Sequence, residues 1–148
     1  MTRVVQAGLD DLEMLLEMFD AYRSFYKRDS DLDGARAYLT ARLERGEATV
    51  FLALDDSGAA LGFALCYSTF SSVAMKPLVI LNDLFTIPKA RGLGVGSALI
   101  GACANFARVK GALILRLRTA TDNKTAQRVY DKAGFKRDVL YYTYDLTL

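Results

Sequence analysis

Residues 89–100 read KARGLGVGSALI, and this stretch says most about the fold. Gly92, Gly94 and Gly96 alternate with other residues, Arg91 precedes them, and apolar residues at helical spacing follow. Glycines at this density weaken a helix start, so we expect them where the backbone must come close to something. A glycine loop that opens a helix presents free N–H groups and the positive end of the helix dipole, which bind phosphate. The alternative is a turn that only tightens strand-to-helix packing, and a glycine motif alone does not separate the two.

Outward from this stretch, hydrophobic periodicity predicts alternating strands and helices. Asp10 is expected to cap the first helix, with Glu13 completing a capping box. Residues 68–77 are expected to form a loop or a ragged strand end. Strands are expected at residues 3–6, 49–54, 60–67, 78–87, 112–119 and 140–146, and helices at about 10–26, 32–46, 95–106 and 123–134. This order predicts a mixed α/β sheet covered by helices, in a single domain of residues 1–148.

The composition excludes several kinds of chemistry. The chain has no histidine, which removes Ser-His-Asp and Cys-His hydrolysis, histidine-bound metals and any imidazole base. Cys66 and Cys103 lie in apolar contexts and are expected to pack in the core. A net charge of +2 is too small to indicate nucleic acid by itself, and no apolar run is long enough to span a bilayer. The N-terminus has no signal pattern, so we expect a cytoplasmic protein with no membrane, nucleic-acid or metal partner.

Two segments in the second half of the chain carry a resemblance. The glycine stretch lacks the Gly-Lys-Ser/Thr of a P-loop and the G-x-G-x-x-G spacing of a dinucleotide site. Residues 91–96, RGLGVG, resemble instead the R/Q-x-x-G-x-G/A pyrophosphate loop of the GNAT superfamily of N-acetyltransferases. Residues 123–135, NKTAQRVYDKAGF, resemble the same family's N-x-x-A-x-x-x-Y-x-x-x-G-F segment. The resemblance covers essentially the whole chain and extends to small stand-alone members akin to histone and polyamine acetyltransferases.

The resemblance implies a fold and a cofactor. The sheet would be mostly antiparallel and splayed between two central parallel strands, residues 78–87 and 113–119, with helices on both faces. Acetyl-CoA would be the donor, no metal would be needed, and a homodimer would form through terminal strands. The freed main-chain groups of the splayed strand would pair with the pantetheine arm, and one N–H would polarise the thioester carbonyl. The residues implied to bind acetyl-CoA are Leu84, Phe85, Thr86, Ile87, Arg91, Gly92, Leu93, Gly94, Val95, Gly96, Ser97, Asn123, Ala126 and Tyr130.

The resemblance also makes Tyr130 the general acid that protonates the departing CoA thiolate. A phenol with a pKa of about 10 and a thiol with a pKa of about 8.5 make this transfer chemically sensible. The alternative is a core tyrosine on an amphipathic helix. Asn123 can cap the same helix and can also donate to the cofactor. Arg128 and Lys132 lie four residues apart and could face the adenosine phosphates or solvent.

Asp83 is the carboxylate that stands out, because it lies mid-strand in an apolar run where an unpaired charge is costly. It is a candidate base or anchor for the acceptor amine, and the alternative is a buried carboxylate that accepts backbone hydrogen bonds. Asn82 stands where many relatives carry a glutamate that acts as the general base, so the identity of the base stays open. The residues expected to surround the acceptor are Tyr22, Phe25, Tyr26, Phe70, Ser71, Asn82 and Asp83.

These patterns favour an N-acetyltransferase in which a primary amine attacks acetyl-CoA directly in a ternary complex. The acceptor could be a small molecule or a protein lysine. Two alternatives stay open: a transferase that uses another acyl-CoA, and a CoA-binding sensor without turnover. A module that binds nucleotide phosphates is disfavoured, because no lysine follows the glycines.

Overall fold

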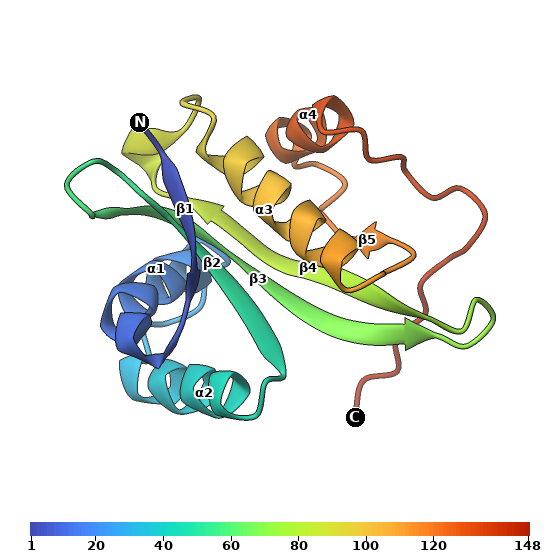
Figure 1. The fold of residues 1–148 in the computed structure, drawn as a ribbon, viewed down its shortest axis with the longest axis horizontal. Helices are drawn as coiled ribbons and strands as arrows, with labels where there is room; N and C mark the ends of the chain where they lie inside the picture. Colours follow the sequence, from blue (N-terminus) through green and yellow to red (C-terminus); the bar gives the residue numbers. More distant parts are fainter. The chain divides into compact units, whose positions relative to one another are not determined.

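The fold is built around one sheet of five strands in the order β1-β2-β3-β4-β5 (Figure 1). The structure, a computed structural model, describes residues 1–148 as two compact units, Met1–Arg118 and Thr119–Leu148. Strands β1 to β4 pair antiparallel with their neighbours, and β5 runs parallel to β4. The elements of the first unit are β1 (Arg3–Ala7), η1 (Leu9–Asp11), α1 (Leu12–Phe25), α2 (Leu32–Glu44), β2 (Ala48–Leu54), β3 (Ala60–Ser71), β4 (Lys76–Thr86), η2 (Pro88–Ala90), α3 (Val95–Val109) and β5 (Leu115–Arg116). The second unit contains α4 (Lys124–Lys132).

Helices cover both faces of the sheet, as the sequence predicts. Helices α1 and α2 lie on one face, and α3 lies on the other (Figure 1). On the α1–α2 face, Leu15, Phe19 and Leu39 pack against the strand residues Phe63 and Leu65. The opposite face is covered by the buried stripe of α3, which consists of Val95, Leu99, Ile100, Cys103 and Ala107. Period-2 alternation along the strands therefore supplies two separate apolar layers.

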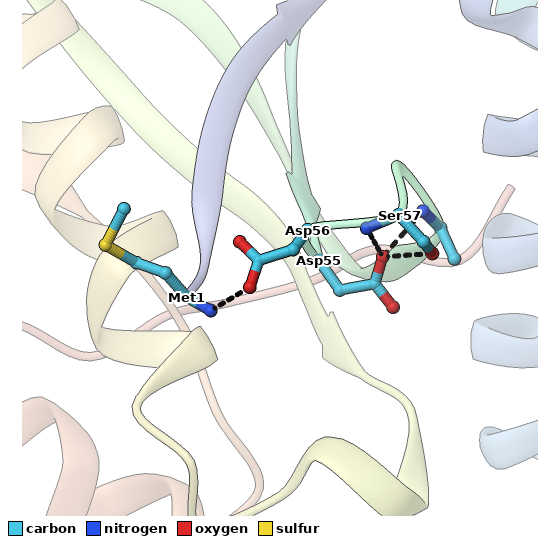
Figure 2. A network of polar contacts seen from close by, with 5 residues as sticks. Met1, Asp55, Asp56 and Ser57 are labelled. Atoms are coloured by element: carbon cyan, nitrogen blue, oxygen red, sulfur yellow. Dashed lines mark hydrogen bonds and ion pairs between the residues drawn. The ribbon is translucent and has the colours of Figure 1, made fainter.

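The predicted hairpin of β2 and β3 is confirmed, and its turn is held by an aspartate (Figure 2). The Asp55 carboxylate accepts hydrogen bonds from Ser57 N and Ala59 N, both at 2.9 Å. The Ser57 hydroxyl donates to the same oxygen at 2.6 Å. Beside this turn, the amino group of Met1 lies 2.9 Å from Asp56 Oδ2. A short side chain that bonds the backbone two to four residues ahead is typical of tight turns.

The start of α1 differs from the prediction. The chain first makes the single turn η1, in which Asp11 Oδ2 accepts a hydrogen bond from Gly8 N at 2.9 Å. Asp10 therefore does not cap α1, and Glu13 does not close a capping box, because the reciprocal bonds form two residues earlier, between Gly8 and Asp11. Glu13 instead forms an exposed ion pair with Arg36 of α2.

The hairpin between β3 and β4 is longer than predicted. Residues 68–77 are expected to form a loop or a ragged strand end, but the ladder continues regularly until Ser71 pairs with Lys76. The turn is four residues long, and Met75 adopts a positive φ of 52° while its N–H donates to Ser72 O at 3.2 Å. The prediction was wrong because most side chains here face solvent on both sides, so no apolar alternation marks the strands.

The C-terminal part of the chain departs furthest from the prediction. Of the expected strand at residues 112–119, only Leu115 and Arg116 form ladder pairs with β4. Leu113 and Ile114 each add one backbone hydrogen bond to β4. The expected strand at residues 140–146 does not form, although its aromatic and β-branched residues favour one. Strand propensity describes how a segment fits a pleated surface, and a strand also needs a partner edge. None of the helices is both long and apolar enough to cross a bilayer.

Candidate functional site

The glycine loop has the backbone of an anion cradle. Gly92 and Gly94 adopt φ values of 79° and 82°, a region that favours glycine. A side-chain carbon added to either residue would meet no atom within 4 Å. At Gly96 it would meet only the Thr86 hydroxyl, at 4.0 Å. Close packing against a strand therefore does not explain the first two glycines, which are required by their positive φ and border open space.

The start of α3 adds hydrogen-bond donors to this loop. The first helical hydrogen bond runs from Ala98 N to Gly94 O at 3.0 Å. The N–H groups of Val95, Gly96 and Ser97 precede that bond and have no carbonyl within the helix to pair with. Gly94 also provides no side-chain cap. Three such donors at the positive end of a helix dipole are suited to phosphate.

Arg91 is held against the end of β4. Its Nε donates to Thr86 O at 3.3 Å, and its guanidinium carbon lies 5.7 Å from the centre of the Phe25 ring. This contact links the end of α1 to the glycine loop. Phe25 and its neighbour Tyr26 are both exposed, with their rings 5.3 Å apart edge to face.

The edge of β4 that faces β5 loses its partner partway along the strand. The parallel ladder ends at Ile80, whereas β4 continues through Thr86. Ile87 N donates to Leu61 O of the β3 side at 3.0 Å. Because backbone groups alternate in direction along a strand, Leu84 and Thr86 turn theirs away from β3, toward the side that β5 has left. The two parallel strands therefore part after Ile80, but β5 is the last strand of the sheet, so the parallel pair is not central as expected.

The predicted cofactor-binding residues differ in how they could take part. Phe85 and Val95 are buried by their side chains in the two apolar layers. The main chain of Val95 could still contact a ligand, whereas that of Phe85 faces its partner Phe63 on β3. Leu93 is exposed in the glycine loop, and Ser97 is exposed in the first turn of α3. A CoA-like group with a pyrophosphate and an amide-bearing arm fits this combination of glycine loop, helix start and free strand edge.

A β-bulge decides which way Asp83 points. Leu65 pairs with Asp83 and Cys66 pairs with Leu81, so Asn82 is an extra residue in β4. The inserted residue reverses the alternation beyond it. Asp83 therefore shares the α1–α2 face with Leu65, whereas the uninterrupted pattern would direct it toward α3.

Asp83 is the one buried charged side chain of the protein, with 7% of its surface exposed. Burial raises the pKa of its carboxyl group, while hydrogen bonds from Tyr22 and Asn82 act in the opposite direction. The Asn82 bond runs from Nδ2 to Oδ1 at 3.1 Å. Both partners are side chains, so the alternative of a carboxylate held by backbone N–H groups does not describe this site. A raised pKa brings the carboxylate closer to the range of a general base.

Tyr22 belongs both to the core and to this site. Its ring packs edge to face against Phe63 at 5.6 Å and Phe85 at 6.2 Å. Burial and the charge of Asp83 raise the pKa of its hydroxyl, so it stays protonated and donates to the carboxylate. Tyr26 lies beside it with a ring separation of 5.0 Å. The structure thus brings Tyr22 to Asp83, and Tyr26 lies next to Tyr22.

Phe70 and Ser71 are placed elsewhere. Phe70 pairs with Pro77 near the hairpin turn and is 78% exposed, whereas Asp83 pairs with Leu65. Five residues of β3 separate these two points, which corresponds to roughly 17 Å of strand. The structure therefore does not bring Phe70 and Ser71 together with Asp83.

Two tyrosines that the sequence analysis did not select lie on the face of Asp83. Tyr67 follows Leu65 by two residues on β3 and so points to the same side. Its hydroxyl forms a hydrogen bond with the hydroxyl of Tyr38 from α2. Burial and this hydrogen bond raise the pKa of Tyr67. The hairpin register, which places residue 67 on the face of residue 65, was the signal that could have identified it.

The second unit presents the other motif. Asn123 caps α4, since its Oδ1 accepts a hydrogen bond from Ala126 N at 3.2 Å. Tyr130 is partly buried, with its ring 5.9 Å from that of Phe135. Phe135 N donates to Tyr130 O at 3.0 Å, and Gly134 has a φ of 93°, which ends the helix. Arg128 and Lys132 are exposed on the same helix.

Comparison with known proteins agrees with these features. Residues 13–135 match the acetyltransferase (GNAT) family. An uncharacterized N-acetyltransferase of Bacillus subtilis strain 168, YhfO, is 41% identical over 143 residues, covering 97% of this chain and 95% of the relative. An aminoglycoside N(6')-acetyltransferase type 1 of Salmonella typhimurium is 30% identical over 97 residues, covering 62% of this chain and 66% of the relative.

The fold is likewise similar to that of solved structures. A crystal structure of a probable acetyltransferase superposes with a TM-score of 0.94 at 37% identity, covering 99% of this chain and 97% of that chain. The family match spans both the glycine loop and the Asn123–Tyr130 segment. The chain therefore belongs to the GNAT family of N-acetyltransferases, enzymes that use acetyl-CoA.

Proposed function

We propose that this protein transfers an acetyl group from acetyl-CoA to a primary amine, by direct attack of the amine in a ternary complex. The observation that carries the proposal is Asp83. It is a buried carboxylate with a raised pKa that a bulge places next to the free edge of β4. At this point of the sheet, one carboxylate could attract a cationic amine and also accept its proton.

The donor would be held by main-chain groups. Acetyl-CoA, when bound, supplies the acetyl group as an activated thioester. The N–H groups of Val95, Gly96 and Ser97 would bind its pyrophosphate, in the open space above the glycine loop. The outward main-chain groups of Leu84 and Thr86 would bind the pantetheine arm, and a free N–H there would stabilise the developing oxyanion.

Asp83 would accept the proton of the acceptor ammonium, directly or through water. Tyr22 donates to the carboxylate and keeps it oriented. Asn82 cannot serve as the base, because an amide does not accept a proton at neutral pH, but it also donates to Asp83. In this proposal Asp83 is the general base, in place of the glutamate that many relatives carry at the position of Asn82.

Direct transfer is supported by the lack of a suitable nucleophile. Both cysteines are buried, and the hydrogen bond with Cys103 together with burial raises the pKa of the Cys66 thiol. A protonated, enclosed thiol is a poor nucleophile. Tyr130 would protonate the departing thiolate, an assignment that rests on its place in the family motif. The match at residues 13–135 crosses both units, which supports the proposal that residues 1–148 act as a single acetyltransferase domain.

The acceptor is a small molecule or a protein lysine in this proposal. The Salmonella relative is named for aminoglycoside acetylation, which supports amines in general. Another acyl-CoA donor and a CoA-binding sensor without turnover are the competing functions. A homodimer and a cytoplasmic location stay predictions.

The test is thiol release from acetyl-CoA in the presence of a panel of primary amines. We expect turnover with the parent protein, and we expect Asp83→Asn to lower kcat/KM for the amine by about 100-fold or more, because one acid–base group is lost. The Kd for CoA, measured by calorimetry, should change little. Binding of CoA without thiol release from any amine would support the sensor instead, and turnover with propionyl-CoA alone would support another donor.

A further inference from the structure

Beyond Asp83, the α1–α2 face carries a second polar group, formed by Tyr67, Tyr38 and Arg42. We infer that this group, defined here as the anion end, binds a negative charge on the acceptor. The acceptor would then be an ω-amino acid, whose amine lies at Asp83 and whose carboxylate lies at the anion end. The inference rests on the proposed function and names its substrate class.

From the side of Asp83, contacts lead from Tyr67 to Tyr38 and on to Arg42. Tyr67 shares the face of Asp83 on the adjacent strand. Its hydroxyl bonds to that of Tyr38, and the guanidinium carbon of Arg42 lies 5.1 Å from the centre of the Tyr38 ring. The Tyr38 side chain is stacked on Phe19 at 6.2 Å, so its position is fixed by packing. Tyr38 is 40% exposed and the Arg42 side chain is 23% exposed, so solutes can reach this end.

The anion end keeps a net positive charge. Arg42 Nε lies 3.4 Å from Glu47 Oε2, and Arg45 Nη1 lies 3.8 Å from Glu47 Oε1. Two arginines thus share one carboxylate. Arg42 Nε is buried and makes no hydrogen bond of good geometry. The hydroxyl of Tyr67 lies between the two charges. Besides burial and the Tyr38 hydrogen bond, the negative charge of Asp83 raises the pKa of Tyr67, and the positive charge of Arg42 lowers it.

The hydroxyls of Tyr38 and Tyr67 provide one O–H donor beyond the hydrogen bond between them. Tyr38 and Tyr67 together carry two O–H hydrogens, and the bond between them uses one. The second O–H and the Arg42 guanidinium are suited to an acceptor atom that is also an anion. A neutral alkyl chain would leave these donors to water, and a second ammonium group would be repelled by Arg42. The anion end therefore favours a carboxylate over an alkyl group or an ammonium group.

The strand geometry gives the approximate length of the acceptor, since the side chains of Asp83 and Tyr67 leave the same face of the sheet. Asp83 and Tyr67 are diagonal neighbours on paired strands, which places their backbones roughly 7–8 Å apart. An α-amino acid, with its amine and carboxylate two bonds apart, is too short to reach both ends. An aliphatic chain of about five or six carbons spans such a distance.

The experiment uses three acceptors of equal chain length: 6-aminohexanoate, hexylamine and 1,6-diaminohexane. Their far ends are anionic, neutral and cationic. We expect kcat/KM for thiol release from acetyl-CoA to be at least about tenfold higher with 6-aminohexanoate than with the other two, the size of one charged hydrogen bond. A preference for hexylamine or 1,6-diaminohexane overturns the inference.

Variants assign the preference to the anion end. Arg42→Gln should lower kcat/KM for 6-aminohexanoate by about 10- to 100-fold, mainly through KM, and leave hexylamine within about twofold. Arg42→Lys, which keeps the charge, should restore part of the loss. Arg36→Gln is the matched control, since Arg36 is also an arginine of α2 in an ion pair but its partner is Glu13, and it should leave the preference unchanged.

The outcomes separate this inference from the proposed function. An equal loss with all three acceptors in Arg42→Gln would make Arg42 a structural residue and overturn the inference. The thermal midpoint of the variant checks that the fold is kept. No thiol release with any of the three, but release with other amines, overturns the inference and leaves the acetyltransferase proposal intact. No release with any amine at all counts against both.

Discussion

The two edges of β4 differ more than any other pair of regions in the sheet. Toward β3, the ladder runs from Gly62 to Ser71 and is interrupted only by the bulge at Asn82. Toward β5, ladder pairs form only at Val79 and Ile80, with one further backbone hydrogen bond from Leu113 N to Pro77 O at 2.8 Å. Buried main-chain groups are almost always paired in folded proteins, so an edge left open within the sheet indicates a place for a ligand. One edge of β4 holds the fold together, and the other edge is available for chemistry.

The same contrast exists along the α1–α2 face of the sheet. Phe63 and Leu65 are fully buried and surrounded by apolar side chains. Asp83, opposite Leu65, is buried with its charge and is held only by side-chain donors. Such a group lowers stability, and proteins keep such groups mainly at functional sites. The comparison predicts that changes at the open edge and at Asp83 alter activity far more than stability, in contrast to changes in the apolar layer.

The largest expected effect follows from Tyr130→Phe, which tests whether the motif of the second unit acts in catalysis. The ring and its contact with Phe135 are kept, and one hydroxyl is removed. If this hydroxyl is the general acid, kcat should fall by roughly 10- to 10⁴-fold, while the Kd for acetyl-CoA changes little. The loss should be smaller with an acyl donor whose leaving thiol is more acidic, because a better leaving group needs less protonation.

Two observations decide that prediction. Tyr141→Phe removes a hydroxyl from an exposed tyrosine of the same unit and should leave kcat unchanged. If Tyr130→Phe turns over as fast as the parent protein with both donors, Tyr130 is a packing residue and its catalytic role rests on family analogy alone.

An intermediate effect is expected from Gly94→Val, which changes the glycine loop that follows the open part of β4. The new side chain would fill the space above the loop and would be strained at a φ of 82°. We expect the affinity for CoA to fall by about 10- to 100-fold, as for the loss of one or two charge-assisted hydrogen bonds. Calorimetry with CoA measures this change.

The control for that change lies at the other end of α3. Gly111 also has a positive φ, of 68°, and a side-chain carbon there would meet no atom within 4 Å. Gly111→Val should therefore cause similar backbone strain, seen as a lower thermal midpoint, without a loss of CoA affinity. Equal CoA affinities for the parent protein and the folded Gly94→Val variant would contradict the phosphate-binding role of the loop.

The smallest effect expected is on stability, from Asp83→Asn. Burial raises the pKa of Asp83, so the folded protein holds this proton more tightly than the unfolded chain does. Its contribution to stability is therefore fully present below the ordinary carboxyl pKa of about 4 and is lost as the pH rises through the raised value. Asparagine stays neutral, so the variant should unfold at a higher temperature than the parent near neutral pH.

This difference should shrink as the solution is acidified, because the parent then becomes neutral at the same position. Thermal unfolding at neutral and at acidic pH measures both parts of the prediction. A variant that is less stable than the parent at neutral pH would show that the hydrogen bonds from Tyr22 and Asn82 outweigh the cost of burying the charge.

Local features of the molecule could be predicted from the sequence. The glycine loop, the Asn123 cap and the end of α4 at Gly134 are all present where the sequence predicts them. Each depends on the backbone of a few adjacent residues, so the residue types alone determine it. The start of α1 is an instructive exception, because Gly8 and Asp11 closed the turn before Asp10 could cap it.

What the sequence determined by itself was therefore the helices and the first four strands, the two motifs and the chemistry that the absence of histidine excludes. Only the tertiary structure decided where pairing stops and which side chains meet. The bulge at Asn82 turns Asp83 toward Tyr22, and the register of β3 brings Tyr67 to Tyr38. A shift of one residue in register reverses every side chain beyond it, and that register is set by contacts between strands far apart in the chain.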